Sequence, residues 1–248
     1  MTRDVASNSA TLRVFRGDAS GGEGREYTVS TLPGMVVLDA LHQIQAEQDG
    51  TLAVRWNCKA ARCGSCSAEV NGRPRLLCKT RLDEFTGAIQ VDPMRTFPLV
   101  KDLVTDVSFN YEVNKKIKPF TPREEGPFRI LQEDVDRSQE FRKCIECFLC
   151  QDVCHVLRDH GQQAAYFGPR YMVRIAALEM HPMDAADRRD QLAGDAGIAY
   201  CNITKCCEEL CPEHIHITDN AIIPLKERVA DGRYDPLRWA IRRITGKV

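Results

Sequence analysis

The sequence predicts an α+β protein in which a domain of short strands, residues 1–108, precedes an all-α domain, residues 109–248. Alternating apolar and polar residues, which are typical of half-buried strands, occur in the first part of the chain. Apolar residues at helical spacing dominate the second part. Between them, the stretch 110–126 carries lysines, prolines and a glycine, which is the composition of a linker or an extended arm.

The first domain is expected to contain, after a loose polar start at 1–10, strands at 11–16 and 25–29, a helix at 36–44, a strand at 52–56, a hairpin at 68–77, a strand at 87–93 and a short helix at 100–107. The hairpin turns at Asn71-Gly72, because Asn-Gly favours a two-residue turn. His42 is expected on the solvent side of its helix. Together with a cysteine loop after residue 56, this order predicts a β-grasp ferredoxin domain of the plant type.

The second domain is expected to contain helices at 135–142, 169–180, 184–190 and 218–230. Pro169 suits the first turn of its helix, because proline lacks the N–H that this turn leaves unbonded. Gly232 is expected to end the last helix. The amphipathic, basic tail at 238–244, which includes Trp239, is expected to pack on the core, and docking to a partner is the alternative.

Composition excludes several classes of function. The net charge is −1 with 28% charged residues, so the chain has no excess of positive charge to attract nucleic acid. The first residues lack the apolar stretch of a secretory signal. No run of about 18 apolar residues occurs, so any membrane association is expected to go through a partner.

Twelve cysteines are abnormal for a chain of 248 residues. Disulfide scaffolds are usual in small secreted chains, and this chain is large. Zinc is a stronger rival, because Cys-x2-Cys pairs are common zinc ligands. Iron–sulfur clusters, however, account for eleven of the cysteines with known spacings and predict a reducing compartment.

The first cysteine set has the plant-type [2Fe-2S] spacing, and Cys78 supplies the fourth ligand; the set is Cys58, Cys63, Cys66 and Cys78. Gly64 and Ser65 suit a loop that folds closely around sulfur and offers it backbone N–H groups. Lys59 and Arg62 would offset the negative charge of the site and raise its reduction potential. The alternative for these two residues is a solvated loop face.

The second run has the bacterial-ferredoxin spacing, in which the fourth cysteine joins a different cluster; it consists of Cys144, Cys147, Cys150 and Cys154. A third run repeats this pattern with Thr204 in the second position; it consists of Cys201, Cys207 and Cys211. Crossing over the fourth cysteines predicts a [4Fe-4S] cluster on Cys144, Cys147, Cys150 and Cys211, and a [3Fe-4S] cluster on Cys154, Cys201 and Cys207. Cys206 is expected to be a buried thiol, with a four-iron cluster that uses it as the alternative.

These three spacings, in this order from Leu12 to about Val229, resemble the iron–sulfur subunit of succinate dehydrogenase and fumarate reductase. The resemblance implies three clusters in series between the FAD of a flavoprotein subunit and a quinone at a membrane anchor of the cytochrome b type. It implies that the chain is an oxidoreductase subunit that carries electrons, with succinate oxidation favoured over fumarate reduction. No catalytic residue for the dicarboxylate is expected in this chain, because that chemistry belongs to the flavoprotein.

The chain departs from the family pattern near the third cluster. His155 follows Cys154 where proline is common, and Arg158-Asp159 and Asn202 stand in the regions of a usual Trp and His. This resembles members whose anchor carries haem b and binds menaquinone itself, and it implies a peripheral place on the cytoplasmic face of a bacterial inner membrane. His155 is a candidate contact for the quinone or a haem edge, and a hydrogen-bonded structural histidine is the alternative.

Two rival functions remain at this stage. The first is the iron–sulfur subunit of another flavin-linked dehydrogenase or of a heterodisulfide-reductase-like complex, which often lacks the plant-type site or has two complete four-cysteine runs. Thr204 and the Cys58 loop argue against it. The second is a zinc- or cluster-dependent binding protein without electron transfer, which would not need three dissimilar sites.

Overall fold

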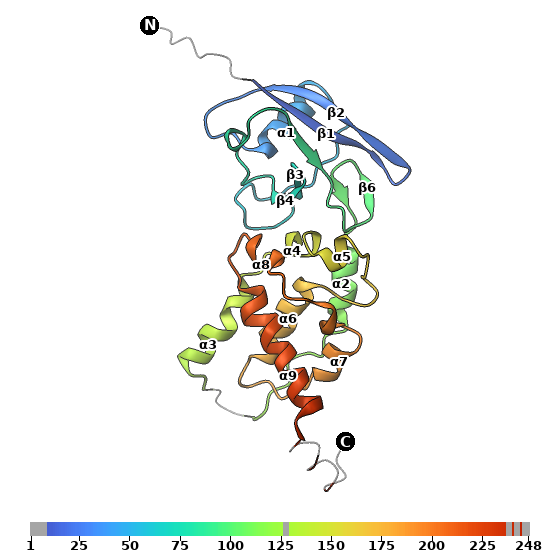
Figure 1. Cartoon of the computed structure of the whole chain (residues 1–248). Helices are drawn as coiled ribbons and strands as arrows, with labels where there is room; N and C mark the ends of the chain where they lie inside the picture. Colours follow the sequence, from blue (N-terminus) through green and yellow to red (C-terminus); the bar gives the residue numbers. More distant parts are fainter. Residues whose placement is uncertain (1–8, 126–128, 237–239, 241–243, 245–248) are drawn as a thin grey trace. The chain divides into compact units, whose positions relative to one another are not determined.

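The computed structural model describes residues 9–125 and 129–236, together with residues 240 and 244 (Figure 1). It divides into two compact units. The first comprises Met1–Val107 and Ile145–Val153, and the second comprises Ser108–Cys144 and Cys154–Val248. Both units are therefore discontinuous in sequence, whereas the predicted domains are continuous. No helix in the described part of the chain is long and apolar enough to cross a membrane.

The first unit is built on a mixed sheet (Figure 1). Strand β1 (Ser9–Asp18) pairs antiparallel with β2 (Gly21–Ser30) along its whole length and parallel with β5 (Ile89–Asp92). Strand β5 also pairs antiparallel with β3 (Ser67–Val70), which forms the predicted hairpin with β4 (Arg73–Leu76). The hairpin turns at Asn71 and Gly72, which both have positive φ, so the Asn-Gly prediction is confirmed.

Helix α1 (Val37–Glu47) supplies the other side of the first core. Its buried face carries Leu38, Leu41 and Ile44, which are fully buried in the same apolar cluster as Leu12 of β1. This is the helical spacing that the sequence indicated.

Two predictions for this unit are wrong. Residues 52–56 form no strand, and residues 100–107 form the short strands β6 (Leu99–Lys101) and β7 (Val104–Thr105) instead of a helix. The cause is Asp102, which has a φ of 50° and a buried carboxylate. The carboxylate accepts hydrogen bonds from Arg16 Nε at 3.0 Å and from the backbone N–H groups of Gly17 at 3.0 Å and Ala53 at 2.8 Å. The side chain of Asp102 thus accepts the hydrogen bonds of backbone N–H groups that a neighbouring strand would otherwise accept.

The second unit and the segment 145–153 are helical. The helices are α2 (Ser108–Lys115), α3 (Gln132–Gln139), α4 (Leu149–Asp152), α5 (His155–Arg158), α6 (Pro169–Glu179), α7 (Arg189–Ala193), α8 (Cys206–Glu209) and α9 (Ile223–Tyr234). The predictions of α3 and of α6, with Pro169 in its first turn, are confirmed.

Other boundaries in the second half differ from the predictions. The stretch 110–126 is not wholly extended, because it begins inside α2. The helix predicted at 184–190 is wrong, since α7 begins only at Arg189. Gly232 does not end α9, which follows a π-helical stretch at Ile217–Ile222 and runs to Tyr234. Most of the predicted tail at 238–244, including Trp239, lies outside the described residues.

Arg188 explains why residues 184–188 are not helical. Its guanidinium is fully buried and pairs with Asp184 at 2.7 Å and Glu179 at 3.2 Å. It also donates to the carbonyl oxygens of Lys118 at 2.8 Å and Pro119 at 2.9 Å. One buried cation therefore fastens the 118–119 segment, which the sequence predicted to be part of a linker or an extended arm, to the body of the second unit.

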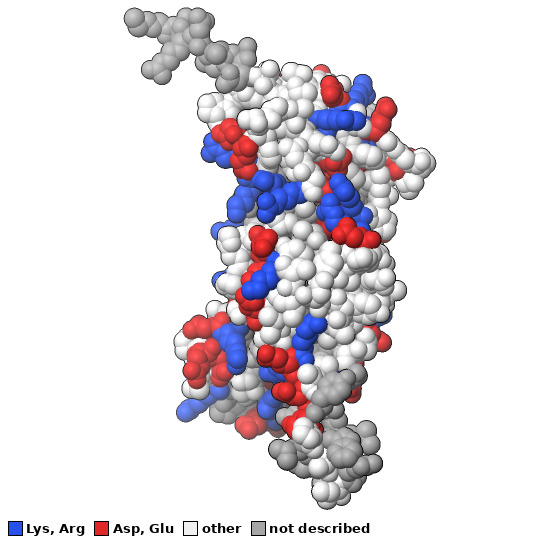
Figure 2. Space-filling model, in the orientation of Figure 1, with Lys and Arg blue, Asp and Glu red and all other residues white. Residues whose placement is uncertain are grey.

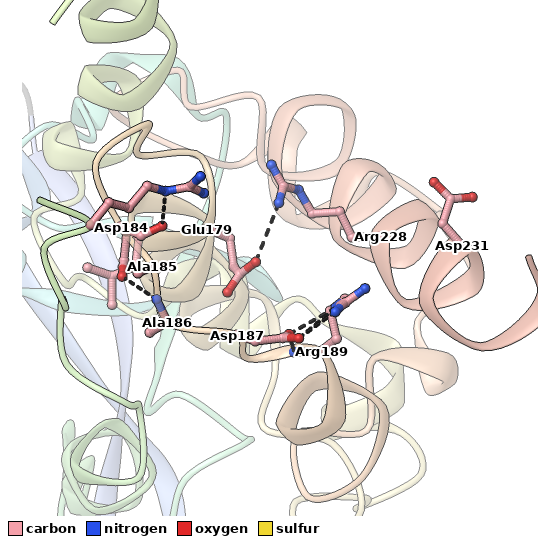
Figure 3. Close-up of a pocket in the computed structure, with 10 residues that line it drawn as sticks. Glu179, Asp184, Ala185, Ala186, Asp187, Arg189, Arg228 and Asp231 are labelled. Atoms are coloured by element: carbon pink, nitrogen blue, oxygen red, sulfur yellow. Dashed lines mark hydrogen bonds and ion pairs between the residues drawn. The ribbon is translucent and has the colours of Figure 1, made fainter. Parts of the chain in front are cut away.

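A charged pocket lies beside this network (Figure 3). Each of its three arginines has a partner: Arg123 donates to the carbonyl oxygen of Asp184 at 3.0 Å, Arg189 pairs with Asp187, and Arg228 lies 3.6 Å from Glu179. Acidic and basic side chains are likewise interspersed on the face of the molecule shown in Figure 2, in keeping with the net charge of −1.

We expect Arg188→Met to lower the free energy of unfolding by about 3–5 kcal/mol, because Asp184 and Glu179 would remain buried without their cation. Thermal unfolding of the cluster-loaded chain measures the loss. Arg189→Met is the matched control, since its pair with Asp187 is partly exposed and should contribute about 0–1 kcal/mol. Equal losses in the two variants would contradict the role given to Arg188.

Candidate functional site

The four cysteines of the first set lie in the first unit, on the loop between α1 and β3 and just after β4. The backbone N–H groups of Ala60 and Arg62 each donate to Cys58 Sγ at 3.3 Å. The N–H of Cys78 donates to Cys66 Sγ at 3.4 Å. The loop therefore presents amide donors to sulfur, as an iron–sulfur site requires.

Left-handed residues give this loop its shape. Lys59 and Ala61 have φ values of 52° and 54°, which residues with a β-carbon seldom adopt. They directly precede Ala60 and Arg62, the residues whose amides bond Cys58. Alternation of left-handed residues along a loop turns successive N–H groups toward one point and makes an anion-binding concavity.

The cysteines of this first set shift the pKa values of one another's thiols. Burial alone would raise the pKa of Cys63, but hydrogen bonds from the hydroxyl and amide of Ser65, together with Cys58, lower it to about 7. Burial raises the pKa of Cys66 to about 12, and the neighbouring Cys78 and Cys63 contribute in the same direction. The structure thus brings all four cysteines together and places Ser65 where it stabilises a thiolate.

One basic side chain of the loop packs on an aromatic ring. The Lys59 ammonium sits over the ring of Trp56, 5.0 Å from its centroid, while the N–H of Arg62 is bonded to Cys58. His42 packs edge-on against the same Trp56 at 4.7 Å, and its Nε2 is buried without a partner. His42 is thus half-buried and lies outside the buried face of α1, as predicted, but its ring is covered by Trp56. Burial, with a contribution from Lys59, lowers the pKa of His42.

Gly64 allows a close approach within the first unit. A β-carbon at this position would lie 2.6 Å from Cys147 Cα, 2.7 Å from Cys147 N and 2.8 Å from the carbonyl oxygen of Ile145. Its φ of 68° is also one that glycine adopts without strain. The loop of the first cysteine set therefore lies directly against the backbone of the second run.

The cysteines assigned to the [4Fe-4S] site are divided between the units. Cys147 and Cys150 belong to the first unit, where both are buried, and Cys144 and Cys211 belong to the second. In the second unit the N–H of Ile215 donates to Cys211 Sγ at 3.4 Å. Burial raises the pKa of Cys211, and the neighbouring Cys144 adds to the effect, so these two thiols lie close together.

The cysteines assigned to the [3Fe-4S] site converge in the second unit. Burial raises the pKa of Cys154 to about 11, and the charges of the nearby Cys206 and Cys201 contribute. Burial also raises the pKa of Tyr166 well above its ordinary value, with further contributions from Cys201, Cys154 and Cys207. One buried tyrosine is thus a neighbour of all three thiols. No sequence pattern pointed to Tyr166, because it lies in an irregular segment between α5 and α6.

The second and third runs repeat one backbone conformation. Left-handed residues follow Cys144 by two and four positions, at Glu146 and Phe148, and they follow Cys201 by the same steps, at Ile203 and Lys205. Phe148 directly precedes α4, and Lys205 directly precedes α8. This repeat places Thr204 in the position of Cys147, and Cys206 in the position of Leu149, as the spacing indicated.

Cys206 is half-buried, so the prediction that it is a buried thiol is wrong. Thr204 Oγ1 donates to Cys206 Sγ at 3.3 Å. A hydrogen bond from Cys207, with further ones from Thr204 and His155, lowers the pKa of Cys206 to about 5. The ring of His155 lies 6.3 Å from that of His160.

The donor set fits iron–sulfur clusters. None of the twelve cysteines, all of which the structure describes, is in a disulfide. Across the described residues, no three His, Cys, Asp or Glu side chains converge as tightly as a single metal ion needs. In a cluster the thiolates bind different irons and need not meet at one point, and N–H donors to sulfur complete such a site.

The comparisons with known proteins agree with this geometry. Residues 11–112 match a family described as a 2Fe-2S iron-sulfur cluster binding domain, and residues 140–215 match a 4Fe-4S dicluster domain. The fumarate reductase iron-sulfur subunit of Mycobacterium tuberculosis is 36% identical over 76% of this chain and 79% of its own length. The succinate dehydrogenase iron-sulfur subunit of Bacillus subtilis is 29% identical over 78% of this chain and 81% of its own.

A solved structure is also similar. A chain of the Mycobacterium smegmatis Sdh1 complex in the apo form is 60% identical, covers 93% of this chain and 99% of its own, and has a TM-score of 0.90.

We expect Gly64→Ala to destabilise the first unit more than Gly72→Ala does. Both glycines have positive φ, so alanine strains either backbone by about 1–2 kcal/mol. At Gly72 a β-carbon meets nothing within 4 Å, whereas at Gly64 it meets backbone that cannot move aside easily. Thermal unfolding measures both losses, and equal losses would show that the close approach at Gly64 is unimportant.

Proposed function

The chain belongs to the family of succinate dehydrogenase and fumarate reductase iron–sulfur subunits, and we propose that it passes electrons between the FAD of a flavoprotein subunit and a quinone through [2Fe-2S], [4Fe-4S] and [3Fe-4S] clusters. It is an electron-transfer subunit of an oxidoreductase complex with domains for 2Fe-2S and 4Fe-4S clusters. The observation that carries the finer proposal is the incomplete repeat, in which Thr204 takes the place of a cysteine.

The proposed ligands are Cys58, Cys63, Cys66 and Cys78 for [2Fe-2S]; Cys144, Cys147, Cys150 and Cys211 for [4Fe-4S]; and Cys154, Cys201 and Cys207 for [3Fe-4S]. The convergence of the first and third sets in the structure supports their assignment. Cys206 takes the position of Leu149 in the repeated loop, where the second run has no ligand, and this supports leaving it out of the ligands.

The protein's own task is to hold and shield these sites. Amides of Ala60 and Arg62 offset charge on Cys58, and Ser65 does so on Cys63. Lys59 and Arg62 add positive charge near the first site. Gly64 brings the Cys63 loop against Cys147, and the probability of electron transfer falls steeply with distance, so this contact favours transfer between neighbouring sites.

We propose a β-grasp ferredoxin fold for the N-terminal region and a bacterial-ferredoxin-like fold for the helical region. The mixed sheet with β1 and β5 parallel, and α1 packed in its core, supports the first. The repeated left-handed loops that precede α4 and α8 support the second.

The proposed partners are a flavoprotein subunit with FAD and a membrane anchor of the cytochrome b type with haem b and menaquinone. The complex would lie at a bacterial inner membrane with this chain peripheral on the cytoplasmic face, and succinate oxidation is the favoured direction. His155, which contacts Cys206 beside the third site, is the candidate contact for the quinone, and a purely structural histidine is the alternative.

In the assembled complex, we expect Cys58→Ala to abolish quinone reduction while succinate still reduces the flavin of the partner subunit, because the first site of the series would be lost. Flavin bleaching and quinone turnover, measured on the same preparation, test this. Cys206→Ala is the matched control, because it removes a thiol that is not a proposed ligand and should leave quinone reduction intact. Quinone turnover that survives Cys58→Ala or Cys147→Ala would refute the serial relay.

A further inference from the structure

Tyr166 is a buried polar residue that the ligand assignment does not use. Its side chain is 1% exposed, and its hydroxyl is buried without a hydrogen-bond partner of good geometry. A buried hydroxyl without a partner is costly, so its position calls for an explanation. The segment that carries it, between α5 and α6, is irregular, and no regular element requires a tyrosine there.

The backbone around Tyr166 is fixed by Gly197. A β-carbon at Gly197 would lie 1.7 Å from the carbonyl oxygen of Ala165 and 3.2 Å from Tyr166 Cα. The N–H of Phe167 also donates to the carbonyl oxygen of Ala196 at 3.2 Å. The segment that begins at Gly197 therefore lies directly on the backbone of Tyr166. Cys201 follows four residues later, so this contact holds the tyrosine and the cysteine near each other.

The polar neighbours of the Tyr166 hydroxyl are thiols. Cys201, Cys154 and Cys207 all act on it, and Cys201 lies within reach of a hydrogen bond. These are the three cysteines that we propose as ligands of the [3Fe-4S] cluster. The hydroxyl is thus buried among the three thiols of a single proposed site.

We propose that the Tyr166 hydroxyl donates a hydrogen bond to the Cys201 sulfur and thereby raises the reduction potential of the third cluster. This inference rests on the proposed [3Fe-4S] assignment. Reduction adds one electron, delivered by the preceding site or by dithionite in a titration, and no proton leaves the tyrosine. A donor stabilises the more negative, reduced form more than the oxidised form, and it does so strongly where water is excluded.

The test is Tyr166→Phe, which removes only the hydroxyl, in the assembled complex. A redox titration followed by low-temperature EPR gives the midpoint potential of the cluster from the signal of its oxidised form. We expect the signal to remain and the equilibrium to shift about tenfold toward the oxidised form, which is a fall of about 59 mV for one electron. A change of potential separates tuning from a merely structural role.

Tyr171→Phe is the matched control. Tyr171 is also fully buried, and its hydroxyl also lacks a partner, but its charged neighbours are Asp195 and Arg188. We expect its removal to leave the midpoint potential unchanged. A fall of the same size in both variants would mean that burial of any tyrosine, and not the contact with Cys201, sets the potential, which would overturn the proposal.

The remaining outcomes are also decisive. An unchanged midpoint potential in Tyr166→Phe, with the signal present, overturns the role of Tyr166 alone. A wild-type complex without the oxidised signal overturns the [3Fe-4S] assignment beneath it. If Tyr166→Phe does not assemble, the hydrogen bond is tested by ENDOR on the wild-type complex exchanged into deuterium oxide. We expect an exchangeable hydrogen coupled to the oxidised cluster. The absence of such a hydrogen refutes the hydrogen bond.

Discussion

The structure depends on left-handed residues in the cysteine loops, which at Cys58 turn two backbone amides toward the sulfur. Six residues with a β-carbon hold positive φ in the cysteine loops: Lys59, Ala61, Glu146, Phe148, Ile203 and Lys205. Each costs of the order of 1–3 kcal/mol and persists only where its surroundings enforce it. In the first unit, where Cys147 and Leu149 join the main apolar core, packing supplies that enforcement. The shape of the cysteine loops therefore depends on the stability of the fold that surrounds them.

The same constraint explains how the third site differs from the second. Both runs adopt the repeated loop, but Thr204 presents a hydroxyl where Cys147 presents a thiol. The hydroxyl donates a hydrogen bond to Cys206. Beside the three thiols that we propose as ligands lies the buried Tyr166, which we propose as a donor to that site.

The sequence predicted the hairpin at Asn71-Gly72 and the helix at Pro169 correctly, because each follows from a local rule. The cysteine sets follow from spacing in the same way, and their assignment to clusters stays a prediction. Local rules failed where one buried polar side chain replaces a regular element. Asp102 bonds Gly17 and Ala53 and so abolishes a strand and a helix, and Arg188 does the same for the helix at 184–190. Such partners lie far away in sequence, and no local pattern reveals them. Tyr166 was missed for the same reason.

Low-temperature EPR on the complex in its oxidised and dithionite-reduced forms tests the proposed set of three clusters most directly. The incomplete repeat predicts a near-isotropic signal close to g ~2.01 when oxidised, and the rhombic signal of a reduced [2Fe-2S] cluster after reduction. An oxidised sample that is silent while iron reaches about ten or more per chain would contradict it, because a fourth ligand would then complete a four-iron cluster at the third site.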